Sequence, residues 1–158
     1  MKVPYISISG ADWERIVFNC TARDFPVPER ATWEDAIEEV AANQQRFNWN
    51  SISPPTPTAR KIFLDVQRRL DRQFREYLEL YCAIGTSLDW DYGTDGFFRI
   101  DKYVVPIDLT SNRKKAFLKS DVVIVMAQDV LGKKLGRPCR RIARIFNKSL
   151  REIDFGGG

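Results

Sequence analysis

The sequence contains no histidine, and its three cysteines, Cys20, Cys82 and Cys139, show no CxxC spacing. Without histidine, the protein cannot use a His-dependent nucleophilic triad. An odd number of scattered cysteines also argues against a disulfide framework and against a structural zinc site. These absences exclude disulfide-stapled folds and the common zinc and triad hydrolases.

Long apolar runs are also missing, since the longest, VVIVMA at 122–127, is far shorter than the roughly 18 residues of a membrane span. The first residues, MKVPYISISG, lack the apolar segment of a secretory signal. The 158 residues are 44% hydrophobic and 29% charged, which suits one soluble domain. We expect a single cytoplasmic domain over residues 1–158 with no membrane partner.

Charge is distributed unevenly behind a net value of +4. Residues 84–110 carry two basic and five acidic side chains, whereas residues 111–158 carry twelve basic and four acidic ones. An acidic middle followed by a basic end suggests a cation site beside an anion-binding surface. The alternative is a basic end that is simply solvated.

The order of predicted elements indicates an α/β domain with a mixed sheet. Thr32 and Asp35 resemble a capping box that opens a helix to about Phe47. The prolines of SISPPTPT end this mainly helical N-terminal extension, residues 1–57. For the core at 58–153, the sequence predicts a helix over 58–83 and strands within 87–100 and 103–110. It then predicts a short helix over 111–119, a buried parallel strand over 121–127 and a helix over 138–153.

The predicted helix over 58–83 carries one apolar stripe, and charges four residues apart, such as Asp65 and Arg69, are expected to pair on its exposed face. Two polar residues depart from this pattern. At 100° per residue, Gln67 lies within the apolar stripe and Asp71 on its flank. A polar group in such a place needs a partner.

Two aspartates lie in the strands that follow this helix. If Asp101-Lys102 forms a two-residue hairpin turn, Phe98 faces Val105 and Asp95 faces Asp108. Alternation then places both aspartates on the face opposite the predicted core face, together with Phe97, Arg99, Pro106 and Thr110.

Directly opposed like charges destabilise a sheet, but two carboxylates can share a divalent cation such as Mg²⁺ or Mn²⁺. We therefore interpret Asp95 and Asp108 as metal ligands. The competing interpretations are that Asp108 satisfies the backbone or Arg99 at a strand end, and that Asp95-Gly96 is only a turn.

This arrangement resembles the PD-(D/E)XK nuclease superfamily over residues 58–130. The 13-residue separation of Asp95 from Asp108 and the 24-residue separation of Asp71 from Asp95 are similar to those in archaeal Holliday-junction resolvases. The resemblance implies a restriction-endonuclease-like mixed β-sheet flanked by helices. It also implies that Asp95 and Asp108 are catalytic Mg²⁺ ligands and that Asp71 or Gln67 occupies the position of the acidic or amide residue on the family's helix.

The sequence departs from the family's motif at Thr110, which stands where the motif has lysine, and at Thr94, which stands where the motif has proline. That lysine is expected to orient the attacking water and to offset developing negative charge. Lys114 or Lys115, on the predicted short helix, is expected to replace it.

Basic side chains follow one face of the predicted last helix, and Cys139, Ile142, Phe146, Leu150 and Ile153 lie opposite. Like charges four residues apart destabilise a helix, and a phosphate backbone would relieve that repulsion. We predict that this surface contacts nucleic acid through Arg113, Lys133, Lys134, Arg137, Arg140, Arg141, Arg144, Lys148 and Arg151.

We therefore expect a Mg²⁺-dependent endonuclease that hydrolyses phosphodiester bonds in DNA, acting as a monomer or a homodimer. Two alternatives remain open at this point. The first is a nucleic-acid-binding module on the same fold that does not cleave. The second is a protein-interaction domain that uses its basic C-terminal helix.

Overall fold

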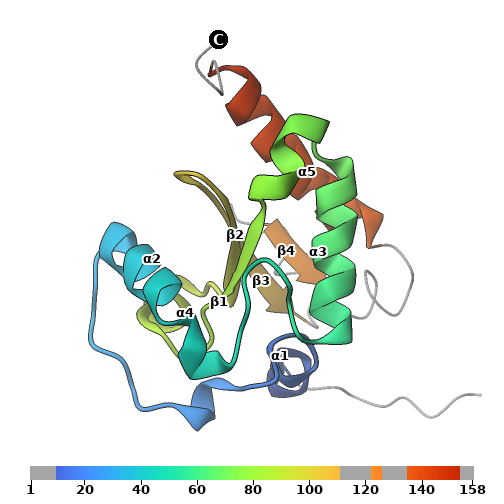
Figure 1. Cartoon of the computed structure of the whole chain (residues 1–158). Coiled ribbons are helices and arrows are strands. Elements are labelled where there is room, and N and C mark those ends of the chain that lie inside the picture. The colour runs from blue at the N-terminus through green and yellow to red at the C-terminus, as the bar shows by residue number, and fades with distance from the viewer. Residues whose placement is uncertain (1–9, 111–121, 126–134, 154–158) are drawn as a thin grey trace, which may run out of the picture.

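A four-stranded mixed sheet lies at the centre of the molecule, with helices on both sides (Figure 1). The computed structural model describes residues 10–110, 122–125 and 135–153. The strands β1 (Glu79–Cys82), β2 (Gly96–Ile100), β3 (Tyr103–Thr110) and β4 (Val122–Val125) lie side by side in chain order. The first three are antiparallel neighbours, and β4 is parallel to β3. The predicted α/β class, the mixed sheet and the parallel strand within 121–127 are confirmed.

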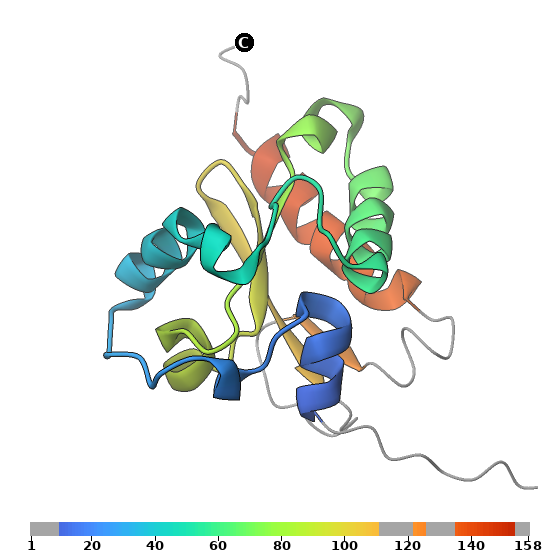
Figure 2. The same ribbon diagram turned by 60° about the horizontal axis from the view of Figure 1, so that its bottom comes forward.

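The helices form two groups. α1 (Gly10–Phe18), α3 (Pro57–Arg69) and α5 (Gly136–Arg151) lie on one side of the sheet, and α2 (Trp33–Ala42) and α4 (Ser87–Tyr92) lie on the other (Figures 1 and 2). Each group encloses its own cluster of buried apolar side chains. None of these helices has the length and apolar character needed to cross a membrane.

The hairpin of β2 and β3 has the predicted register. Ile100 pairs with Tyr103 and Phe98 with Val105. Asp101, in the turn, has a φ of 55°, the left-handed conformation that a two-residue hairpin turn requires. The alternation of side chains therefore fixes which residues of the hairpin share a face.

The prediction that one face of the hairpin lies outside the core is wrong. Phe97 is fully buried on that face and stacks on Tyr81, with ring centroids 4.9 Å apart. The face is covered because α2 and α4 supply apolar side chains against it, namely Ala36, Ile37, Val40 and Leu88. Asp95 and Asp108 consequently lie between protein layers rather than on an open surface.

The predicted long helix over 58–83 is also wrong in its second half. α3 begins after Thr56, whose hydroxyl accepts a hydrogen bond from the N–H of Ala59, and ends before Leu70, which has extended backbone. A 3-10 turn at Arg72–Tyr77 and strand β1 follow. The apolar spacing persists because Leu70, Phe74 and Leu78 are all buried, although Leu70 follows α3, Phe74 lies in the 3-10 turn and Leu78 precedes β1.

Residues 87–92 form helix α4 rather than the predicted strand. Gly85 and Gly93, with φ values of 75° and 66°, flank this helix in the left-handed conformation that glycine adopts without strain. The last helix, predicted over 138–153, starts two residues earlier and ends two residues earlier, at Gly136–Arg151.

α2 begins as predicted, since the Thr32 hydroxyl accepts a hydrogen bond from the N–H of Asp35, but it ends at Ala42 and a 3-10 turn at Gln44–Phe47 follows. The side chain of Gln44 then pairs with the outer edge of β1. Its Oε1 accepts from the N–H of Cys82 at 2.9 Å, and its Nε2 donates to the carbonyl of Cys82 at 2.9 Å. Trp49 Nε1 donates to the carbonyl of Leu80, whose N–H donates to the carbonyl of Ser51.

α1 belongs to the main core, although the sequence predicted an N-terminal extension. Trp13, Val17 and Phe18 are buried in the same cluster as the residues of α3 and α5. Phe18 packs directly on Gly96, the first residue of β2. A Cβ atom on Gly96 would lie 2.5 Å from Phe18 Cζ and 2.7 Å from the carbonyl oxygen of Tyr81.

We predict that Gly96→Ala lowers the free energy of unfolding by about 1–3 kcal/mol or more, because either α1 or β1 must move to admit the methyl group. Urea denaturation followed by tryptophan fluorescence measures this change. Gly136→Ala is the matched control, because its methyl group would meet the ends of two arginine side chains, Arg69 Nη2 at 2.9 Å and Arg140 Nη2 at 3.9 Å, rather than backbone. A Gly96→Ala protein as stable as the control would contradict the close packing of α1 on β2.

Candidate carboxylate metal site

Asp95 and Asp108 lie together at the end of the hairpin opposite its turn. The backbone N–H of Asp95 donates to the carbonyl of Ile107 at 3.0 Å, one residue out of the hairpin register, whose last pair is Gly96 with Ile107. The N–H of Leu109 donates to Asp95 Oδ2 at 2.8 Å. Each aspartate is only 5% exposed, and the two carboxyl groups are joined by a hydrogen bond, although Asp95 lies beyond the last pair of the hairpin.

Burial and mutual proximity disfavour ionisation of this pair. The pKa of Asp95 is raised well above its ordinary value, first by burial, and then by the hydrogen bond with Asp108 and the negative charges of Asp108 and Asp89. The N–H of Leu109 opposes this shift only in part. Asp95 therefore keeps its proton to higher pH than an exposed aspartate does, unless a cation replaces that proton.

Two further carboxyl groups reach the same place. Oxygen atoms of Glu14, Asp89 and Asp95 all lie within 4.8 Å of one another. Glu14 comes from α1, and Asp89 comes from α4, where its Oδ2 accepts a hydrogen bond from the N–H of Gly85 at 2.8 Å. Burial, and then the charge of Asp89, raise the pKa of Glu14 to about 7. We refer to Glu14, Asp89, Asp95 and Asp108 as the carboxylate cluster.

The donor atoms of the cluster suit Mg²⁺ or Mn²⁺. Both ions prefer oxygen ligands in octahedral geometry, and bonds of about 2.1 Å place adjacent oxygens about 3.0 Å apart and opposite oxygens about 4.2 Å apart. From separations of at most 4.8 Å, adjacent oxygens of Glu14, Asp89 and Asp95 would have to approach one another by up to about 1.8 Å to reach such spacings. A cation would also offset the repulsion that raises the pKa of Asp95 and Glu14.

Asp71 and Gln67 have partners elsewhere. Asp71 forms a bidentate ion pair with Arg151 of α5, and its N–H donates to Asn147 Oδ1 at 2.9 Å. Gln67 Nε2 donates to the carbonyl of Arg75 at 3.0 Å. The predicted helical position of Asp71 does not exist, because α3 ends at Arg69 and Asp71 precedes the following 3-10 turn. Asp71 instead fixes α5 to the end of α3.

Sequence reasoning missed Glu14 and Asp89. The excess of acidic residues in 84–110 included Asp89 without distinguishing it from its neighbours. Glu14 gave no local signal, because it lies 81 residues before Asp95 and reaches it through the packing of Phe18 on Gly96.

Thr110, the residue at the motif's lysine position, ends β3 two residues after Asp108, and its backbone pairs with Val125 of β4. The two lysines predicted to replace the motif lysine, Lys114 and Lys115, lie outside the described residues, as do Arg113, Lys133 and Lys134.

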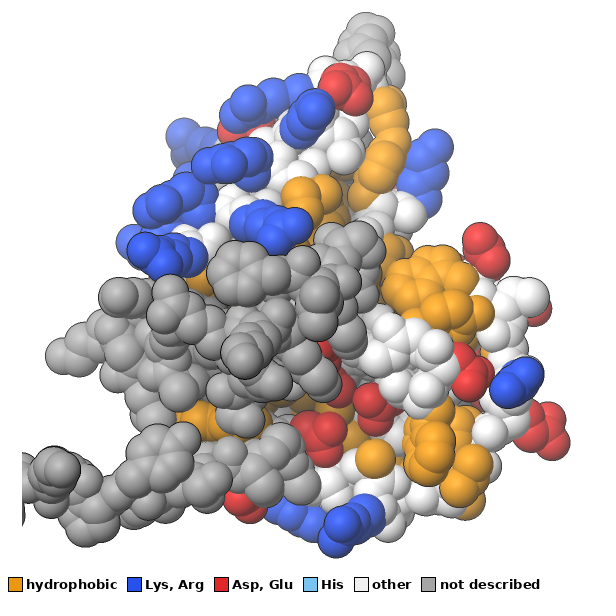
Figure 3. Space-filling model, turned by 180° about the vertical axis from the view of Figure 1, so that it is seen from behind, with side chains coloured by type: hydrophobic (Ala, Val, Ile, Leu, Met, Phe, Trp, Pro, Cys, Tyr) orange, Lys and Arg blue, Asp and Glu red, His pale blue; other side chains and the backbone are white. Residues whose placement is uncertain are grey.

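The basic stripe on α5 is present as predicted. Cys139, Ile142, Phe146 and Leu150 are buried, whereas the predicted Ile153 is 42% exposed. Every predicted basic residue of the helix is exposed, namely Arg137, Arg140, Arg141, Arg144, Lys148 and Arg151. Seen from behind, basic side chains gather over α5, and acidic side chains are visible on the same face of the molecule (Figure 3).

We predict that the stability of the metal-free protein falls as the pH rises from about 4.5 to about 7. Because the folded-state pKa values of Glu14 and Asp95 are raised, the folded chain holds more protons than the unfolded chain in this range, and stability therefore decreases with pH. Thermal unfolding in EDTA across this range measures the trend. Glu14→Gln should weaken the dependence of the melting temperature on pH, whereas Glu29→Gln, which changes an exposed residue, should leave it unchanged. An equal pH dependence in the wild type and both variants would contradict the raised pKa of Glu14.

We also predict that Mn²⁺ or Mg²⁺ stabilises the protein at neutral pH. A ligand that binds only the folded state adds about 2.7 kcal/mol to the free energy of unfolding at one hundred times its dissociation constant. The melting temperature should therefore rise with the metal concentration. Asp95→Asn should abolish this rise, whereas Asp101→Asn, at the other end of the hairpin, should retain it. A wild-type protein that is indifferent to both metals would contradict a metal site.

Comparisons of this chain with protein-family models, with curated proteins and with solved structures found no match. We therefore infer the function from the carboxylate cluster and from the charge on the surface of the described residues.

Proposed function

We propose that this protein hydrolyses phosphodiester bonds in nucleic acid, most favourably DNA, with Mg²⁺ or Mn²⁺ held by the carboxylate cluster. The observation that carries the proposal is the contact between Asp95 and Asp108, two buried carboxyl groups joined by a hydrogen bond, with Glu14 and Asp89 close to Asp95. A cluster of this kind destabilises the metal-free protein, and a divalent cation compensates for that cost.

The order of the elements supports a restriction-endonuclease-like fold. The two aspartates occupy a strand start and a strand end in successive antiparallel strands, and a parallel strand follows. This is the arrangement on which the resemblance to the PD-(D/E)XK nucleases rests. Glu14 on α1 supplies the helical acidic residue that the resemblance assigned to Asp71 or Gln67.

Within the cluster, the four carboxyl groups have different surroundings and so can take different roles. Asp95 and Asp108 are the most buried and are suited to hold the cation. A bound divalent cation polarises a phosphodiester and lowers the pKa of a water molecule. Glu14, only half-buried and with a pKa of about 7, is suited to exchange a proton with water or a leaving group at neutral pH.

A second candidate function is nucleic-acid binding without cleavage. The observation that favours it is Thr110, which stands at the position of the motif lysine and cannot supply a positive charge. If the protein does cleave, Lys114 or Lys115 would supply the positive charge in place of the motif lysine. Both candidates use the basic stripe of α5, which lies on the same face as acidic side chains (Figure 3).

Nicking of supercoiled plasmid DNA with Mg²⁺ or Mn²⁺ tests the proposal. We expect metal-dependent conversion to open circles that stops on addition of EDTA. Asp108→Asn should lower the rate at least about 100-fold, because it removes one negative charge from the site while preserving the shape of the side chain. Lys114→Ala and Lys115→Ala then identify which lysine assists.

Asp101→Asn is the matched control for this experiment. It removes one carboxylate from the same hairpin, at the exposed turn, and asparagine tolerates the left-handed conformation found there. Its rate should equal that of the wild type. Wild-type protein that never nicks DNA, or nicking that survives Asp108→Asn, would overturn hydrolysis by this cluster.

A further inference from the structure

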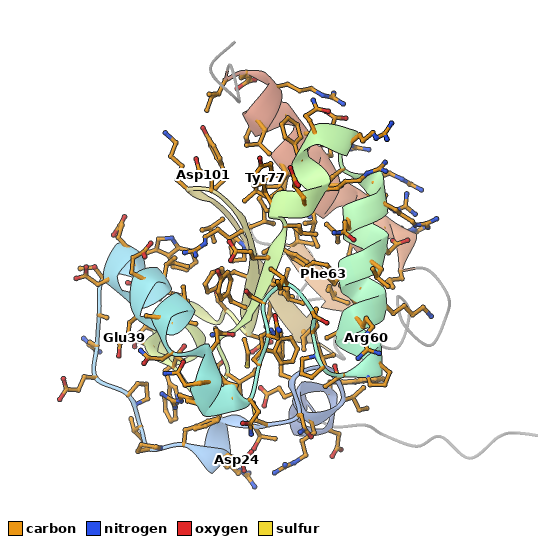
Figure 4. The ribbon with its side chains drawn as sticks, in the orientation of Figure 1. Asp24, Glu39, Arg60, Phe63, Tyr77 and Asp101 are labelled. Carbon is orange, nitrogen blue, oxygen red and sulfur yellow. The ribbon has the colours of Figure 1, made fainter. Side chains whose placement is uncertain are left out.

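The basic stripe of α5 borders a groove against the end of α3. This groove is lined by Arg69, Arg140, Ala143, Arg144, Asn147, Lys148 and Arg151, and we call it the Arg69 groove. Side chains that end in nitrogen project along the outer sides of α3 and α5 (Figure 4). The sequence predicted the α5 side of this surface and assigned Arg69 only to a helix-surface ion pair.

Arg69 is held in place at the floor of the groove. Its Nε donates to Asp65 Oδ2 at 3.1 Å, one helical turn earlier, and its side chain is only 24% exposed. Asn147 Nδ2 donates to the carbonyl of Arg69 at 3.3 Å. An arginine fixed at both its backbone and its Nε loses little further freedom when its remaining N–H groups bind a ligand.

A second guanidinium group approaches the same point. A Cβ atom built on Gly136, the first residue of α5, would lie 2.9 Å from Arg69 Nη2 and 3.9 Å from Arg140 Nη2. The two Nη2 atoms are therefore both within a few ångströms of one position above Gly136. Like charges that converge repel one another, and an anion placed between them would turn this repulsion into attraction.

The acidic residues beside the groove neutralise only part of its charge, because Arg140, Arg144 and Lys148 have no ion pair among the described residues. Asp65 is shared between Arg68 and Arg69, and Asp71 is already paired with Arg151. Arg140, Arg144 and Lys148 follow one another at intervals of four residues, or about 6 Å along the helix. The groove thus presents a row of cations that leads away from the convergent pair.

We propose that the Arg69 groove binds the phosphate backbone of DNA, with one phosphate between Arg69 and Arg140 above Gly136 and others along Arg144 and Lys148. The lining favours nucleic acid over a protein partner. Among the residues that line the groove, Ala143 alone is apolar, whereas protein interfaces need an apolar centre. The proposal deepens the proposed function by assigning the substrate-holding surface, and it requires no metal.

Binding of a short fluorescein-labelled DNA duplex in EDTA, followed by fluorescence anisotropy, tests the groove without cleavage. We expect Arg140→Gln and Arg144→Gln each to weaken binding about three- to tenfold and to reduce the slope of log Kd against log salt by about 0.9. Arg30→Gln, an exposed change before α2, is the control for net charge and should leave Kd within about twofold.

Gly136→Ala is the more specific variant, because it changes no charge. Its methyl group would displace the Arg69 guanidinium, so we expect binding to weaken about as much as in Arg140→Gln, with an unchanged melting temperature. Unchanged affinity in this variant would overturn the convergent phosphate site. An Arg30→Gln effect equal to that of Arg140→Gln, or displacement of DNA by polyglutamate of equal charge, would overturn the groove as a nucleic-acid site.

The same measurements separate this proposal from hydrolysis. Asp108→Asn should bind DNA in EDTA with wild-type affinity, since it leaves the groove intact. If the wild type binds DNA through these arginines but never nicks it, the groove stands and hydrolysis falls. If nicking occurs and the groove variants bind normally, hydrolysis stands and the Arg69 groove falls.

Discussion

The contact between the buried carboxyl groups of Asp95 and Asp108 is the constraint on which the rest of the candidate site depends. The two-residue turn at Asp101-Lys102 sets the hairpin register as far as Gly96 and Ile107, and the two aspartates come next to these residues in the chain. Burial makes the arrangement costly, because two carboxyl groups are removed from water and the N–H of Leu109 offsets the resulting shift in the pKa of Asp95 only in part. A chain that keeps such a pair inside its fold needs either a proton or a cation there.

Small residues at the sheet allow the other two carboxyl groups to approach. Gly96 has no side chain, so Phe18 packs against the backbone of β2 and brings α1, with Glu14, to the end of the hairpin. Gly85 begins the segment that carries α4, and its N–H orients one oxygen of Asp89. The cluster is therefore assembled by packing between elements far apart in sequence, and each element contributes a single acidic side chain.

The parts of this protein that could be predicted are those governed by local periodicity. The hairpin register, the cap of α2 at Thr32, strand β3 and the two faces of α5 depend on alternation, capping and helical spacing, which are visible in short windows. The α3 prediction ran too far because buried residues kept a three-to-four spacing through Phe74 and Leu78, where a turn and β1 replace the helix. The role of Glu14 was not predictable, because only tertiary packing connects α1 to Asp95.

Opposite charges are separated on the molecule in a way that suits a polyanion. The carboxylate cluster would repel phosphate groups by itself, and the cations of α5 supply the compensating attraction over a surface rather than at one point. Surface charges act over about 10 Å at 0.1 M salt, so the balance between the two regions depends on ionic strength.

Gln44 has a consequence for how copies of this protein can associate. An uncovered strand at the border of a sheet is a template onto which another chain can add a strand. Here the amide of Gln44 occupies both hydrogen-bonding groups of Cys82, and Trp49 and Ser51 occupy those of Leu80. The β1 side of the sheet is thus closed by the chain's own residues, and a homodimer built by continuing the sheet across β1 would first have to expel them. A pairing of two copies that leaves this fold intact therefore cannot extend the sheet across β1.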